Sequence, residues 1–159
     1  KVAQEIERKF LVQGDFSGLA VKKLKITQGY LSLDKARTVR IRIQDELSFI
    51  TIKGITNAAG LSRYEWEKEI NRDEAEELLK LAIGIPIQKT RYLIPLDNHL
   101  FEVDVFEGEN NGLIIAEVEL QSEADFFTRP NWLGKEVSGD IRYYNANLIL
   151  KPFKSWGVK

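Results

Sequence analysis

The chain has 159 residues, of which 43% are hydrophobic and 30% charged, so it is long enough for one domain with a core and too apolar for a disordered chain. Basic and acidic residues nearly balance, at 23 and 24, which argues against a general nucleic-acid or membrane-surface binder. Without cysteine and with one histidine, the chain has no disulfide, thiolate or multi-histidine metal site. With no long apolar run either, we expect a single cytoplasmic domain over residues 1–159.

Apolar and charged residues alternate strictly along most of the chain, with the period of a β-strand. Seven or eight short strands of this kind favour an antiparallel barrel or sandwich, a mainly β fold with a few helices attached. The alternation predicts strands over residues 4–12, 26–33, 39–43, 49–53, 64–70, 89–94, 100–106 and 114–121.

A helical period interrupts the strands after Asn71. Asn71 and Glu74 match a capping box, and Gly84 and Pro86 follow the last residue of the helical pattern. Three further segments are predicted outside the alternation: a short helix or irregular stretch over residues 19–25, a short helix over residues 122–127 and a final helix over residues 143–150.

The charged positions of these strands fall in phase, six of them basic and nine acidic. The bases are Lys9, Arg40, Arg42, Lys53, Lys89 and Arg91, and the acids are Glu5, Glu7, Glu65, Glu67, Glu69, Glu102, Asp104, Glu117 and Glu119. A charged face turned to solvent is the commonest meaning of such alternation. Acids two apart on one strand are costly unless cations are held nearby, however, and nearly every position is ionised. This favours a closed barrel with the charges inside.

The chemistry of this interior predicts a ligand. Lysine and arginine suit phosphate oxygens, and carboxylates without histidine or cysteine suit Mg²⁺ or Mn²⁺. The excess of three acids would be reversed by about two divalent ions, as two-metal phosphoryl-transfer sites require. Gly134-Lys135 lacks the upstream glycine of a Walker loop, so side chains would hold the phosphates.

The motifs themselves resemble the CYTH superfamily, also called triphosphate tunnel metalloenzymes, along essentially the full length. E-I-E-R-K at residues 5–9 is similar to the ExExK signature of that family. Q-G-Y (28–30), R-I-R (40–42), T-I-K (51–53), L-S-R-Y-E-W-E (61–67), K-T-R-Y (89–92), F-E-V-D-V-F (101–106), E-V-E (117–119) and D-I-R-Y-Y-N (140–145) follow in order. The set looks like short bacterial inorganic triphosphatases. The resemblance implies an eight-stranded antiparallel β-barrel tunnel that binds a triphosphate with two divalent metals.

The resemblance also implies a role for each charged position. As metal ligands it implies Glu5, Glu7, Glu65, Glu67, Asp104, Glu117 and Glu119. As phosphate-binding residues it implies Lys9, Arg40, Arg42, Lys53, Lys89, Arg91 and, near one mouth, Arg142. The catalytic set is Glu5, Glu7, Lys89, Glu117 and Glu119, with Lys89 orienting or protonating groups at the reacting phosphate. Glu69 and Glu102 are in phase but less securely in the site.

The expected activity is metal-dependent hydrolysis of tripolyphosphate to pyrophosphate and phosphate. An adenylate cyclase of class IV type and a thiamine or nucleoside triphosphatase share the tunnel and stay open as alternatives. A polyphosphate-binding module is the non-enzymatic alternative, although binding alone does not need the carboxylate pairs. No nucleic-acid or membrane partner is expected. The apolar outer faces exceed what three short helices cover, which favours a homodimer.

Overall fold

The computed structural model describes residues 4–157, and within them it contains nine strands and two α-helices. The strands are β1 (Gln4–Val12), β2 (Lys22–Ser32), β3 (Thr38–Gln44), β4 (Leu47–Lys53), β5 (Ser62–Ile70), β6 (Ile87–Leu96), β7 (His99–Phe106), β8 (Ile114–Glu119) and β9 (Leu133–Glu136). The α-helices are α1 (Arg72–Leu79) and α2 (Asn145–Leu150), and short 3₁₀ turns cover Ser17–Leu19, Gly108–Asn110, Ile141–Tyr143 and Phe153–Ser155.

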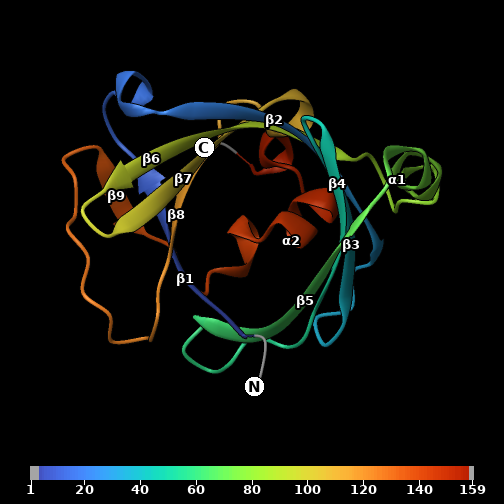
Figure 1. Cartoon of the computed structure of the whole chain (residues 1–159), viewed down its shortest axis with the longest axis horizontal. Coiled ribbons are helices and arrows are strands. Elements are labelled where there is room, and N and C mark those ends of the chain that lie inside the picture. Colours follow the sequence, from blue (N-terminus) through green and yellow to red (C-terminus); the bar gives the residue numbers. More distant parts are fainter. Residues whose placement is uncertain (1–3, 158–159) are drawn as a thin grey trace.

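Strands β1 to β8 form a closed antiparallel barrel (Figure 1). Hydrogen-bonded neighbours run in the order β5-β4-β3-β2-β6-β7-β8-β1, and β1 closes the ring on β5 through residues 4–6. Beyond that contact, β9 pairs with β1 at Phe10 and Val12. The predicted eight-stranded antiparallel barrel is confirmed, and the ninth strand adds to it.

The barrel has inverted polarity, with charges inside and an apolar outer face. Phe10, Phe101 and Val103, which alternate with charged neighbours, are fully buried outside the barrel wall. They pack beneath the segment that contains Phe127 and Trp132, with the ring of Phe127 edge-on to Phe10 and Phe101. The outer face is thus the core of the protein, which leaves the interior free for ionised side chains.

Helix α1 covers the outside of β2, β3 and β4. Its capping box forms as predicted: Asn71 Oδ1 accepts from the Glu74 backbone N–H at 2.8 Å, and Glu74 Oε1 accepts from the Asn71 N–H at 3.4 Å. A Cβ on Gly29 would lie 2.8 Å from the Ala82 Cβ, so a glycine allows the segment after α1 to approach β2.

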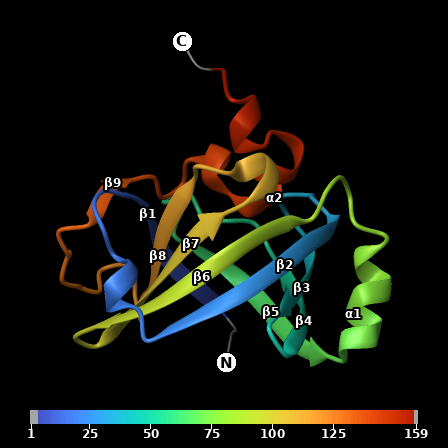
Figure 2. The same cartoon turned by 90° about the horizontal axis from the view of Figure 1, so that it is seen from above.

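The C-terminal segment returns to the barrel and crosses one of its ends. Figure 1 shows α2 within the ring of strands, and Figure 2 shows it beside the strand ends, opposite the end where the chain begins. A second apolar cluster that includes Ile87, Phe106, Tyr143 and Leu148 holds the segment in place. This placement brings residues near position 145 to the barrel interior.

Two predicted features differ from the structure, and one strand, β9, was not predicted. Residues 22–25 belong to β2, because they pair with Leu93 to Thr90 of β6. Residues 122–127 form no helix, because Phe127 packs into the outer core and the chain follows it. β9 has four residues, too few for a visible alternation. No helix within residues 4–157 is long and apolar enough to cross a membrane.

Candidate active site

A cavity of about 1130 Å³ lies inside the barrel and is lined by charge. Its charged lining comprises eight basic and seven acidic side chains, against the six and nine expected from the alternation. Arg63 and Lys35 join the predicted bases, whereas Glu69 and Asp104 do not line the cavity. The remaining predicted acids and bases of the alternating strands all do, so the structure brings them together in one channel. The channel charge is therefore slightly positive rather than negative.

The register of the strands places unlike charges side by side. Lys9 lies opposite Glu117 across β1 and β8, and Lys53 lies opposite Glu65 across β4 and β5. Alternate residues of a strand share a face, so once one residue of a strand points inward, the residues two positions away on that strand point inward as well. This is why sequence alternation predicted the channel wall.

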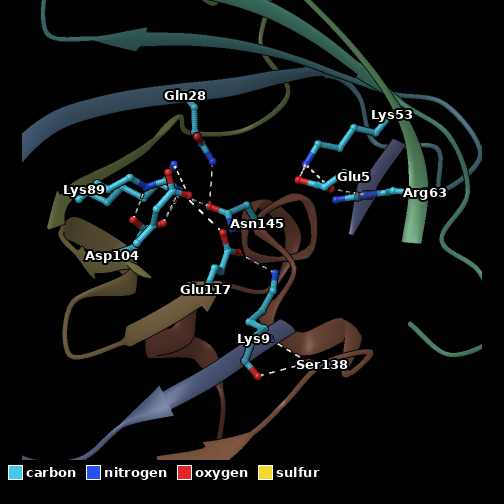
Figure 3. Close-up of polar contacts among 12 residues, drawn as sticks. Glu5, Lys9, Gln28, Lys53, Arg63, Lys89, Asp104, Glu117, Ser138 and Asn145 are labelled. Atoms are coloured by element: carbon cyan, nitrogen blue, oxygen red, sulfur yellow. Dashed lines mark hydrogen bonds and ion pairs between the residues drawn. The ribbon is translucent and has the colours of Figure 1, made fainter. Parts of the chain in front are cut away.

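Two of the predicted metal ligands are engaged by lysines. Both oxygens of Glu5 lie 2.9 Å from Lys53 Nζ, and Arg63 Nε is 3.4 Å from Oε1 (Figure 3). Burial opposes ionisation of Glu5, but Lys53 and Arg63 outweigh it and lower its pKa to about 2. Glu117 Oε2 lies 3.2 Å from Lys9 Nζ, and Lys9 and Arg91 lower the Glu117 pKa against the effect of burial.

Three other acids lack such compensation. Burial, with Glu117 and Glu5 nearby, raises the pKa of Glu7 to about 8. Burial and neighbouring acids, Glu5 first among them, also raise the pKa values of Glu65 and Glu119. Among residues 4–157, no three acidic or histidine side chains already stand together as an ion site. The channel thus holds carboxyl groups that an added cation would favour in their ionised form.

The deepest bases share one buried acid. Asp104 accepts hydrogen bonds from Arg91 Nε at 2.7 Å and Arg91 Nη2 at 2.9 Å. Its Oδ2 lies 2.7 Å from Lys89 Nζ (Figure 3). Asp104 is 2% exposed. The structure therefore places it as an anchor for two bases, not as the channel ligand that we expected from the resemblance, because it faces Arg91 across β6 and β7.

Lys89, which contacts this anchor, and the nearby Arg42 both have lowered pKa values. Burial lowers the pKa of Lys89 to about 7, with Asp104 opposing and Arg91 and Arg42 adding to the shift. Burial and the neighbouring Arg40 and Arg91 lower the Arg42 pKa to about 9. An anion in the channel would relieve both effects.

Arg40 and Glu67 meet farther along the wall. Arg40 Nη2 donates to Thr51 Oγ1 at 3.1 Å and to Glu67 Oε2 at 3.5 Å. Within the described residues, Arg40 Nε is buried without a hydrogen-bond partner. An unpartnered buried donor costs free energy, so this guanidinium is suited to an added acceptor.

Arg142 is not part of the channel lining. Its side chain is exposed, donates to Asp140 Oδ2 at 2.8 Å and lies over the rings of Tyr143 and Trp156. Asp140 caps the 3₁₀ turn Ile141–Tyr143, and pairing with it holds Arg142 outside. Ile141 and Tyr144 near it do line the cavity, so a role for Arg142 near one mouth stays a prediction.

Several lining residues were missed from the sequence. Arg63 is in phase with Glu65, but its strand was predicted to begin at Tyr64. Lys35 lies in a loop, where the sequence has no periodicity from which the direction of a side chain could be predicted. Tyr144 and Asn145 line the channel from the C-terminal segment. The only sequence signal for them was the D-I-R-Y-Y-N motif.

A closed barrel with interleaved glutamates, lysines and arginines on its inner wall defines a phosphate tunnel, and the chain belongs to the CYTH family. The CYTH domain model matches residues 3–152. The chain is 42% identical over 156 residues to an inorganic triphosphatase of Acetivibrio thermocellus, covering 98% of this chain and 99% of that protein. It is 41% identical over 150 residues to an inorganic triphosphatase of Nitrosomonas europaea, covering 92% and 97%.

A solved structure supports the same assignment. The crystal structure of an inorganic triphosphatase aligns with a TM-score of 0.65 at 37% identity, over 91% of this chain and 97% of that one. The family resemblance expected from the motifs is thereby confirmed.

Proposed function

We propose that this protein is a divalent-metal-dependent triphosphatase that hydrolyses tripolyphosphate to pyrophosphate and phosphate inside its barrel. The observation that carries the proposal is one cavity inside the barrel, lined by eight basic and seven acidic side chains. The names of the similar proteins support the reaction, and membership of the CYTH family supports the metal dependence.

The bases of the channel would bind the triphosphate. Lys9, Lys53 and Arg40 are buried on three different strands, and Arg42, Lys89 and Arg91 continue the set toward α2. Arginine can donate two parallel hydrogen bonds to a phosphate, and lysine acts as a point charge. Because these groups are already held in place, little reorganisation is needed when negative charge develops on the leaving pyrophosphate.

The acids of the channel fit hard divalent cations, Mg²⁺ or Mn²⁺, and we propose two of them. Burial first and neighbouring acids second raise the pKa values of Glu7, Glu65 and Glu119, and a bound cation would offset both effects. Glu5, Glu67 and Glu117 supply further oxygen donors in the same cavity. When bound, the ions would neutralise phosphate oxygens and lower the pKa of a water.

Lys89 is proposed to hold a proton near the reacting phosphate. Its pKa of about 7 allows both protonation states near neutral pH, and it is 1% exposed, which keeps its position fixed. A channel carboxylate would accept the proton of the attacking water, and Lys89 would donate to a phosphate oxygen as the terminal bond breaks.

The test is phosphate release from tripolyphosphate, ATP and thiamine triphosphate, each with Mg²⁺, with Mn²⁺ and with EDTA. We expect metal-dependent release, fastest with tripolyphosphate. The Glu7→Gln variant should lose turnover, with Glu69→Gln as the matched control because Glu69 is exposed outside the channel. Formation of cyclic AMP from ATP, or binding without turnover, would instead support the cyclase or the binding module.

The exposed outer face also supports the proposal of a homodimer. Tyr64 and Trp66 point outward from the same face of β5 and are 47% and 40% exposed. Light scattering coupled to size-exclusion chromatography would give the molecular mass of the protein in solution. A monomeric mass at assay concentration would contradict this proposal.

A further inference from the structure

Asn145 presents an amide group to the channel from outside the barrel strands. It is the first residue of α2, the helix that crosses one end of the barrel, and it lines the cavity. Figure 3 shows its side chain between Gln28, Lys89 and Glu117. Strand alternation cannot identify such a residue, because it comes from a different element.

The orientation of this amide is fixed by two donors. Asn145 Oδ1 accepts hydrogen bonds from Gln28 Nε2 at 2.8 Å and from Lys89 Nζ at 2.9 Å. An amide oxygen has two lone pairs, so both are used, and a flipped amide would face two donors with its own N–H groups. Within residues 4–157, Asn145 Nδ2 makes no hydrogen bond. It therefore keeps two N–H donors at the wall of an anion-binding channel.

The same amide connects two bases of the phosphate site. Gln28 is fully buried, and its Oε1 accepts from Arg42 Nε at 3.1 Å. Arg42 and Lys89 are thus held through one chain of hydrogen bonds that passes through Asn145. Lys89 has Asp104 and Asn145 as its partners, so the amide fixes the direction of the ammonium group.

We infer that Asn145 is a substrate-binding and positioning residue of the phosphate site. Its Nδ2 donates to a phosphate oxygen, and its Oδ1 holds Lys89 directly and Arg42 through Gln28. This inference rests on the proposed triphosphatase function. It makes the C-terminal segment a part of the site and not only a cover over it.

Two substitutions separate donation from positioning. Asn145→Asp keeps an oxygen for Gln28 and Lys89 and removes the donor, whereas Asn145→Ala removes both. Asn131→Asp adds the same charge at an exposed position outside the channel lining and is the control. Steady-state hydrolysis of tripolyphosphate with Mg²⁺ gives kcat and KM, at a temperature where unfolding curves show each variant fully folded.

We expect KM to rise about tenfold or more in both Asn145 variants, as loss of one hydrogen bond to a charged group predicts. We expect kcat to fall further in Asn145→Ala, where Lys89 keeps Asp104 but loses Asn145, and both constants to stay unchanged in Asn131→Asp. A wild-type KM in Asn145→Ala would overturn the inference. A wild-type KM in Asn145→Asp would also overturn it, because Asn145 would then only position Lys89 and Gln28 and would not bind substrate. If the wild type itself does not hydrolyse tripolyphosphate, the proposed function fails instead.

Discussion

Glu7 of β1 and Glu119 of the adjacent strand β8 lie directly opposite each other in the barrel wall, so two acids form a cross-strand pair. Like charges in this position destabilise a sheet. The pKa values of both are raised, Glu7 to about 8, by burial first and by neighbouring acids second. After burial, Glu117 and Glu5 raise the pKa of Glu7, and Glu5 and Glu65 raise that of Glu119, so a cation bound beside these carboxyl groups would favour their ionised forms.

Glu7 should make the stability of the metal-free protein fall as pH rises from about 4.5 to 8, and the lowered pKa of Lys89, about 7, acts in the opposite direction above pH 7. The folded-state pKa of Glu7 lies near 8 and its ordinary value is 4.5, so between these values the folded state binds more protons than the unfolded state. Stability is then lost by up to about 1.4 kcal/mol per pH unit across this window. Glu7→Gln should remove this loss and be the more stable protein at pH 8. Urea unfolding in EDTA from pH 5 to 9 measures it; parallel curves for the two proteins would contradict it.

Divalent metal should stabilise the protein more at high pH than at low pH. A metal ion must displace the proton that Glu7 retains, so apparent metal affinity rises as pH approaches 8. We expect the unfolding temperature to increase on adding Mg²⁺ or Mn²⁺, with a larger increase at pH 8 than at pH 6. Glu7→Gln should reduce the increase, and Glu69→Gln should leave it intact. An equal increase at both pH values would argue against ligation by Glu7.

Replacing Asp104 should lower the stability of the metal-free protein, because Asp104 anchors two buried bases. Asp104→Asn leaves Lys89 and Arg91 buried with less opposite charge, a change that typically costs about 3–5 kcal/mol. Glu102→Gln, on the same strand, is the control, because its side chain is 36% exposed and such pairs are worth about 1 kcal/mol or less. Urea unfolding in EDTA compares the two variants. Equal stabilities would mean that Asp104 is not the anchor that its contacts indicate.

Arg40→Ala should weaken substrate binding with little effect on folding. Its partners Thr51 and Glu67 keep their own hydrogen bond of 2.7 Å, and solvent in the channel can replace the guanidinium. Loss of a charged donor predicts a KM for tripolyphosphate about tenfold higher or more. The KM of Arg40→Lys should lie between those of the wild type and Arg40→Ala, because lysine keeps the charge but lacks the paired N–H donors of the guanidinium. An unchanged KM in Arg40→Ala would exclude a contact with substrate.

Asn71→Ala should lower stability without changing catalysis. The capping box at α1 is outside the channel, and loss of such a cap costs about 1 kcal/mol. Chemical unfolding and kcat/KM on the same preparation would show the separation. A change in kcat/KM would reveal a coupling between α1 and the channel wall.

The barrel and most of its inner wall could be predicted because alternation fixes which residues share a face. Once Glu5 points inward, Glu7 and Lys9 must follow, and the same holds on each long strand. Alternation does not show what an inward residue contacts, so it could not separate Asp104, which anchors two bases, from Glu7, which has no such partner. It also says nothing of Tyr144 and Asn145, whose position depends on the packing of Tyr143 and Leu148 on the barrel end.

The barrel closes through a short contact between β1 and β5, and the C-terminal segment completes its interior. Glu7 lies near the start of the sequence, Glu119 about three-quarters of the way along it, and Asn145 later still. During synthesis on the ribosome, the first strand must therefore wait for much of the chain before its acids find their partners. A nascent chain would have no complete channel lining until the stretch around residue 145 has emerged.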